Sequence, residues 1–198
     1  NFSDATHTAF MPLGGLGGGV GPAQQASDSA GASQPTSASA FAGVSSTIPL
    51  IPTRLSIPSI GVINVEVEKV GKKADGSMAT PASFQTVGWY ELGAKPGEAG
   101  NAVIGGHVNN ALTKSGVFEH LSDVKVGDTI SISEKDGRAL TYVVCETDEY
   151  NTQTAPAAEI FTASGTSQLV LVTCDGQWDA AAHSYDKRFV VYARLITR

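Results

Sequence analysis

Residues 169–174 read Leu-Val-Leu-Val-Thr-Cys, an apolar, largely β-branched run that ends in one thiol. Such a run is typical of a buried β-strand. A polar segment, residues 175–187, follows, and Arg188 then opens a second apolar run that extends to Ala193. We expect two adjacent strands joined by a loop, with the Cys174 thiol and the Arg188 guanidinium side by side at the mouth of that loop.

A third strand-like run, residues 101–104, is followed by Gly105, Gly106 and His107. Small residues at a strand end let another backbone or a ligand approach closely. A thiol, an imidazole and a guanidinium at three strand ends together favour a cysteine acyl-transfer enzyme.

Each of these three residues also has a purely structural interpretation. A strand cysteine often serves only as a small apolar side chain. His107 could be a hydrogen-bonded histidine at a strand end, and Arg188 could pair with an aspartate of the flanking polar segment. The position of Cys174 at a strand end, next to polar residues, favours the functional interpretation because substrate must reach a nucleophile.

Other cysteines and histidines compete for these roles. Acidic residues follow Cys145, and negative charge opposes a thiolate, so we interpret Cys145 as a core or idle thiol. His183, in the loop after Cys174, is a second candidate for the general base. We expect His7 and His120 to be solvated or packed.

Composition narrows the class of protein. A chain of 198 residues is long enough to bury one substantial core. Its formal charge is −6 and the sequence contains no block of like charge, which argues against a nucleic acid or a membrane surface as a partner. The two cysteines do not have metal-ligand spacing, so we expect no metal and no cofactor. No run reaches the roughly 18 apolar residues needed to span a bilayer.

The chain divides by composition near residue 46. Residues 1–46 are rich in Gly, Ala and Ser, which predicts a linker or tail, whereas residues 47–198 have the pattern of a folded domain. Turn signals separate short strand-like runs at 54–57, 62–70, 102–104, 129–133 and 140–145. We expect short helical turns within 81–90 and at 117–121, and a long polar loop at 151–168. Eight or so strands without a long helix predict an all-β barrel or sandwich.

Several motifs recur in a distinctive combination. They are Leu-Ser-Ile-Pro-Ser-Ile-Gly at 55–61, Gly-Asn-Ala-Val-Ile-Gly-Gly-His at 100–107, Phe-Glu-His-Leu at 118–121, Lys-Val-Gly-Asp at 125–128, and Thr-Cys at 173–174 with Arg188 fourteen positions after the cysteine. Together they resemble the sortase family of bacterial cysteine transpeptidases. Residues 87–90, 95–98 and 184–186 are most similar to class F sortases of actinobacteria.

The resemblance implies a closed eight-stranded sortase-type β-barrel with one or two short helices over residues 47–198. It implies that Cys174 is the nucleophile, His107 the acid/base and Arg188 the group that stabilises the oxyanion or orients substrate. Such enzymes cleave a Leu-Pro-x-Thr-Gly-like sorting signal between Thr and Gly through a thioacyl-enzyme. They then transfer the acyl group to an amine, such as a peptidoglycan precursor or a pilin lysine.

Further expectations concern the surroundings of the enzyme. We expect a monomer on the extracytoplasmic face of the membrane, anchored by a segment that precedes residue 1. Candidate substrate-binding residues are Thr173, Ile160, Phe161, Trp178 and Tyr185. In the tail, Met-Pro-Leu-Gly-Gly at 11–15 has the order of a sorting signal without its threonine. One hypothesis is that this segment lies in or near the active-site groove as an intramolecular or neighbour-supplied pseudo-substrate, although a spacer is the favoured interpretation.

Two rival functions stay open. A cysteine hydrolase or peptidase on the same scaffold would resolve the intermediate with water, and added oligoglycine would distinguish it from a transpeptidase. A secreted, non-catalytic β-barrel binding module would leave Cys174 inert towards thiol-directed reagents.

Overall fold

The computed structural model describes residues 10–12, 47–109, 115–179 and 184–196, with side-chain environments for 47–109, 115–173 and 185–196. The strands are β1 (Phe10–Pro12), β2 (Arg54–Ile57), β3 (Val62–Val70), β4 (Ser77–Met78), β5 (Val87–Tyr90), β6 (Gly100–Gly106), β7 (Thr129–Ser133), β8 (Ala139–Asn151), β9 (Ser167–Asp179) and β10 (Ser184–Leu195). The helices are one short α-helix, α1 (Ala157–Ile160), and two 3-10 turns, η1 (Pro58–Ile60) and η2 (Leu121–Asp123).

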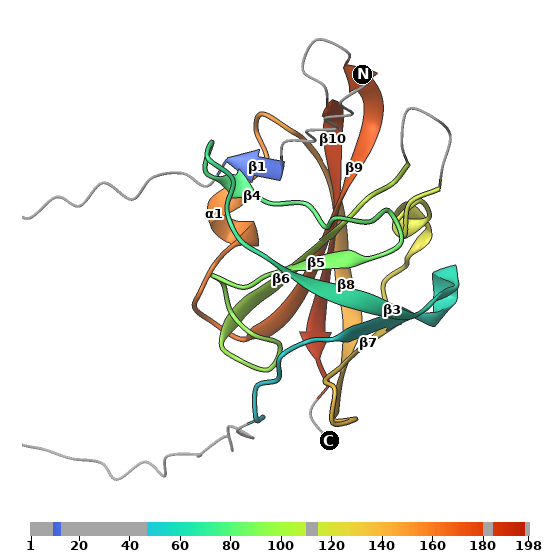
Figure 1. Ribbon diagram of the computed structural model, residues 1–198, viewed down its shortest axis with the longest axis vertical. Helices are drawn as coiled ribbons and strands as arrows, with labels where there is room; N and C mark the ends of the chain where they lie inside the picture. Colours follow the sequence, from blue (N-terminus) through green and yellow to red (C-terminus); the bar gives the residue numbers. More distant parts are fainter. Residues whose placement is uncertain (1–9, 13–46, 110–114, 180–183, 197–198) are drawn as a thin grey trace, which may run out of the picture. The chain divides into compact units, whose positions relative to one another are not determined.

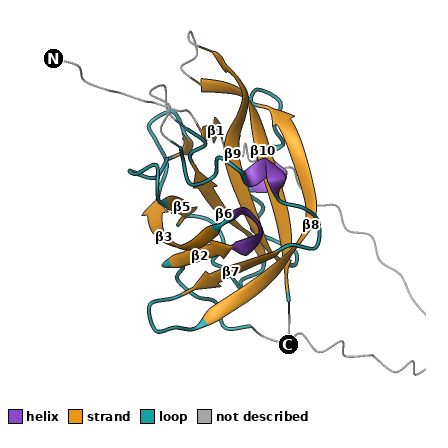
Figure 2. Cartoon of the chain, turned by 90° about the vertical axis from the view of Figure 1, so that its right-hand side faces the viewer, coloured by secondary structure: helices purple, strands orange, loops and turns teal. Residues whose placement is uncertain are grey.

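Eight of the strands close into a barrel in the order β10-β8-β7-β2-β3-β5-β6-β9, so the expected closed, eight-stranded all-β fold is confirmed (Figure 1). Closure depends on two parallel contacts, β3 with β5 and β6 with β9, between otherwise antiparallel neighbours. Figure 2 shows how little of the described chain is helical.

The predicted strands at 54–57, 62–70 and 129–133 match β2, β3 and β7 in both type and bounds. Strands β8, β9 and β10 are longer than the sequence predicts, because each continues from its apolar run into polar residues. The expectations that Cys174 and Cys145 end their strands are therefore wrong. Pairing between β9 and β10 continues to Asp179 and Ser184, since cross-strand hydrogen bonds can hold polar residues in an extended hairpin.

The predicted helical turns also need correction. Residues 117–120 form turns before η2, and residues 82–86 are bends and turns that lead into β5. Conversely, α1 lies inside the predicted polar loop at 151–168.

Apolar side chains form two layers. One fills the barrel interior, with residues such as Ile104, Leu171 and Val191. The other covers the outer face of β6, β9 and β10, where Val172 and Val190 pack with the buried Ile160 of α1 and with Met78 of β4. Both faces of these three strands are therefore covered, which is why their sequences read as continuous apolar runs.

A two-stranded ribbon lies outside the barrel. In it, β1 pairs antiparallel with β4, with Phe10 opposite Met78. The rest of the expected 1–46 tail lies outside the described residues. Within the described ranges, no helix is long and apolar enough to cross a membrane.

Candidate active site

The strand register brings the three candidate catalytic positions to one level of the barrel wall. Cys174 on β9 is the direct partner of Arg188 on β10. On its other side β9 runs parallel to β6, with Thr173 opposite Gly106, and His107 follows Gly106 directly. Positions 174 and 188 thus lie side by side in one hairpin, and position 107, far away in the sequence, directly follows the strand on the other side of β9.

The Arg188 side chain is fully buried, with 0% of its surface exposed. Its Nη1 donates hydrogen bonds to the carbonyl oxygens of Tyr185 at 3.0 Å and Lys187 at 2.8 Å. A buried cation needs such acceptors, because desolvation without them is costly. The backbone of β10 therefore holds this guanidinium beside the position of Cys174.

The His107 ring is half-buried between two residues of the 81–86 segment. Its Nε2 lies 3.2 Å from the carbonyl oxygen of Pro81, and its ring centroid is 4.4 Å from that of Phe84. Burial lowers the pKa of His107, while the Pro81 carbonyl and the negative charge of Glu68 oppose this shift. At neutral pH the site therefore favours the uncharged imidazole.

Thr173 ties two of the strands together. Its hydroxyl donates to the Gly106 carbonyl at 3.0 Å, and only 2% of the residue is exposed. Such a buried bond fixes the end of β6, and with it the start of His107, against β9. The structure places this candidate substrate-binding residue in the wall of the site, below its surface.

The other candidate substrate-binding residues lie in different surroundings. Ile160 is fully buried in the outer apolar layer, and the half-buried Phe161 packs edge-to-face on Tyr90. The Tyr185 hydroxyl donates to the Asn109 side chain, two residues after His107. The backbone of Trp178 pairs with Tyr185, and its side chain lies outside the described residues.

The competing thiol and imidazoles can also be placed. The Cys145 thiol, half-buried on β8, donates to the Tyr192 carbonyl at 3.3 Å. His120 is exposed and its Nδ1 lies 3.3 Å from Asp123. His7 and His183 lie outside the described residues.

Metal ligands do not gather in the described part of the chain, where no group of three or more His, Cys, Asp or Glu side chains could hold an ion.

Residues 55–196 match the sortase domain family. The chain belongs to the sortase family. This assignment supports the expected enzyme class, a sortase-type cysteine transpeptidase, whose members act on sorting signals and amine acceptors at the outer side of the membrane. A search of curated protein sequences finds no match.

Solved structures agree with the fold of this sortase. A sortase from Actinomyces oris has a TM-score of 0.59 and 19% identity, covering 77% of this chain and 87% of that one. Sortase A from Corynebacterium diphtheriae has a TM-score of 0.56 and 22% identity over 76% of this chain, which spans 63% of that structure. Sortase A from Listeria monocytogenes gives 0.54 and 21%, covering 73% and 86%.

Sequence reasoning did not identify the groups that surround the imidazole of this sortase. The imidazole contacts Pro81 and Phe84, which lie between β4 and β5, and its pKa is affected by the charge of Glu68 on β3. No local pattern in the sequence marks these interactions. The only signal was the lone aromatic Phe84 in a small, polar segment.

Proposed function

We propose that this sortase cleaves a Leu-Pro-x-Thr-Gly-like signal between Thr and Gly and transfers the acyl group to an amine. The observation that supports this is the register, which pairs position 174 on β9 with position 188 on β10 and brings the end of β6, directly before position 107, beside β9. Nucleophile, acid/base and anion-stabilising group must meet within a few ångströms for acyl transfer.

In the proposed reaction the Cys174 thiolate attacks the threonine carbonyl carbon, and the carbonyl electron pair moves onto oxygen. Arg188 stabilises this oxyanion, held by the hydrogen bonds to Tyr185 and Lys187. His107 in its protonated form gives its proton to the leaving glycine amine, and the thioester remains on Cys174. An incoming amine then displaces the sulfur and loses a proton to the neutral imidazole.

The finer assignments belong to the same proposal. The motifs at 87–90, 95–98 and 184–186 support class F. The amine is a peptidoglycan precursor or a pilin lysine, and the enzyme is a monomer anchored by a segment that precedes residue 1. Ile160, Phe161, Trp178 and Tyr185 form or support the walls for the signal.

Acyl-enzyme trapping tests this proposal. With a signal peptide and no amine, mass spectrometry should find the thioester on the wild type and on Cys145→Ala, but not on Cys174→Ala. Added oligoglycine should convert the hydrolysis product into ligated peptide, whereas unchanged hydrolysis would favour a cysteine hydrolase.

Substitution of the other two groups tests their roles. Arg188→Lys should lower kcat/KM at least about a hundredfold, since an ammonium cannot reproduce the guanidinium fork and one lost oxyanion donor costs 10²–10³ in rate. His107→Ala should be comparably impaired. Near-normal turnover by His107→Ala, together with loss of activity in His183→Ala, would transfer the acid/base role to His183.

A further inference from the structure

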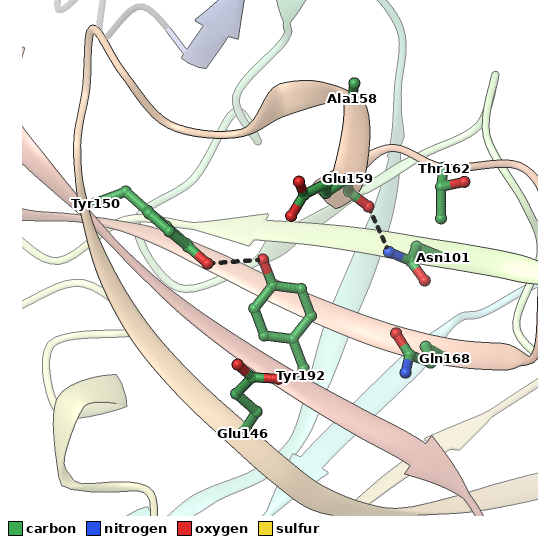
Figure 3. A pocket seen from close by; sticks show the side chains of 8 residues that line it. All are labelled: Asn101, Glu146, Tyr150, Ala158, Glu159, Thr162, Gln168 and Tyr192. Atoms are coloured by element: carbon green, nitrogen blue, oxygen red, sulfur yellow. Dashed lines mark hydrogen bonds between the residues drawn. The ribbon is translucent and has the colours of Figure 1, made fainter.

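A cavity of about 420 Å³ opens on the outer face of the barrel, between α1 and strands β8, β10 and β9 (Figure 3). Nothing in the proposed chemistry uses it. Its lining residues are Asn101, Glu146, Tyr150, Ala158, Glu159, Thr162, Gln168 and Tyr192.

The cavity lies on the same strands as the candidate active site, further along them. Following β9 backwards from Cys174, the outer face first carries the Val172–Val190 pair, covered by Ile160. The next pair is Val170 with Tyr192, and Gln168 follows. From Cys174 to Gln168 the strand advances six residues, or about 20 Å at ~3.3 Å per residue.

Two carboxylates face this space. Glu146, the β8 partner of Tyr192, borders one side, and the Glu159 carboxylate extends from α1 above the Tyr192 hydroxyl (Figure 3). Neither forms an ion pair with any other described residue, and no basic side chain is among the lining residues. Arg194 lies two positions beyond Tyr192, is exposed and does not line the cavity.

Hydroxyl groups form the floor beside Glu146. The Tyr192 and Tyr150 oxygens lie 3.4 Å apart, and the Tyr150 hydroxyl donates to Asp148 at 3.0 Å. Burial, with the nearby Tyr150, Asp148 and Glu146 groups, raises the pKa of Tyr192. These surroundings oppose another negative charge, so a cation that can donate several hydrogen bonds suits the cavity best.

We propose that this cavity is a subsite for the side chain of a lysine or arginine that precedes the sorting signal in the substrate protein. The inference rests on the proposed function, with the threonine at Cys174 and the apolar Leu-Pro end near Ile160. Val170, Val172 and Val190 are fully buried beneath α1, so the peptide passes over α1 rather than directly on β9. Since an extended chain advances ~3.3 Å per residue, it needs at least four to six residues before the threonine to reach the Val170–Gln168 level, which is one to three residues before the leucine.

The test compares peptides that differ at one position. Three series carry Lys, norleucine or Glu at one, two or three residues before the leucine, with the signal unchanged. For the wild type we expect Lys to exceed norleucine by about three- to tenfold in kcat/KM at one of these positions, mainly through KM, because partly exposed ion pairs contribute modestly. Glu should be the poorest, and 0.5 M salt should reduce the preference.

Variants then assign the preference to the cavity. The pair Glu146→Gln and Glu159→Gln should abolish the Lys preference and leave turnover of the norleucine peptide unchanged. Glu66→Gln, an exposed β3 residue, removes the same charge elsewhere and should keep the preference. Because Glu159 is exposed, Glu159→Lys should fold and reverse the order in favour of Glu.

The outcomes separate this inference from the function that it assumes. Equal turnover of Lys, norleucine and Glu peptides at all three positions would overturn the subsite while leaving the transpeptidase intact. A Lys preference that survives both the double variant and Glu159→Lys would also overturn it, since the preference would then arise elsewhere. Absence of turnover for every peptide would count against the proposed function and, with it, against the subsite as stated.

Discussion

His107 combines a position suited to catalysis with a pKa that works against it. The proposed reaction needs a protonated imidazole next to a thiolate, yet burial against Phe84 and Pro81 lowers the pKa of His107. At neutral pH only a small fraction of molecules therefore carries both charges, and Glu68 is the described residue whose charge enlarges that fraction. The pH profile of kcat/KM should show this dependence.

Glu68→Gln should lower the pKa of His107 further, because it removes a negative charge while an amide oxygen can still accept the hydrogen bond from the Ala82 N–H. The acidic limb of the kcat/KM profile should move to lower pH, and the maximum rate should fall. An NMR titration of the His107 ring measures the pKa directly. Glu66→Gln, two positions earlier on β3, serves as the control, and an unchanged His107 titration in Glu68→Gln would contradict the prediction.

At the residue scale, the neighbourhood of the three candidate positions could be predicted, because each of them borders an apolar, strand-like run. Cys174, His107 and Arg188 each stand next to such a run, and strand pairing then brings them together. What could not be predicted is how each group is held. The carbonyls that accept from Arg188 lie on β10 itself, where the register shifts between Tyr185 and Lys187. The Pro81 and Phe84 contacts of His107 come from a segment more than twenty residues away, and no local sequence pattern marks either arrangement.

At the scale of elements, β6 ends where packing is tightest. A Cβ on Gly106 would lie 2.5 Å from the ring of the buried Phe118, whose N–H in turn donates to the His107 carbonyl at 2.9 Å. The sequence predicts that the glycine pair before His107 lets another group pack closely against the backbone. At Gly106 that group is the Phe118 ring. Phe118 thus fixes the backbone on which the imidazole is mounted.

Gly106→Ala should destabilise the protein by about 1–3 kcal/mol, the usual range for overpacking a tight core. Because the Phe118 N–H bonds to the His107 carbonyl, a shift of the Phe118 backbone would disturb His107, and kcat/KM should fall as well. Denaturant unfolding and peptide cleavage measure the two effects. In the matched control, Gly71→Ala, the new methyl meets nothing within 4 Å, so both quantities should stay close to wild type.

The β9–β10 hairpin shows where element prediction fails. Its apolar half was expected, whereas its polar half, residues 175–179 with 184–187, was expected to be a loop. Polarity by itself does not distinguish a loop from a hairpin whose faces meet solvent, because the deciding hydrogen bonds lie across the strands. Ends of elements are therefore harder to predict than their centres.

At the scale of the whole molecule, the closed barrel was predictable from many short strands with no long helix, whereas its strand order was not. The ribbon of β1 and β4 was also unexpected. It attaches residues 10–12 to a segment whose Met78 packs with Val172 and Val190, the neighbours of Cys174 and Arg188 in the register.

Deletion of residues 1–46 tests whether this attachment matters for the site. If residues 11–15 occupy the groove as a pseudo-substrate, the deletion should lower the apparent KM for a signal peptide, or speed labelling of Cys174 by a methanethiosulfonate, by a few-fold. A tethered segment competes at an effective concentration of about millimolar order. Identical KM and labelling rates with and without the tail would leave it as a spacer.

The parallel pairing of β6 with β9 has a consequence for how the newly made chain folds into an active enzyme. Cys174 and Arg188 meet within one hairpin, whereas His107 joins them only through strands separated by about sixty residues of chain. Such distant pairings form late, since the entropy of bringing the ends together must be overcome first. We therefore expect the β6–β9 pairing, which brings position 107 beside position 174, to be among the last to form, and a newly made or stress-unfolded chain to stay inactive until it has formed.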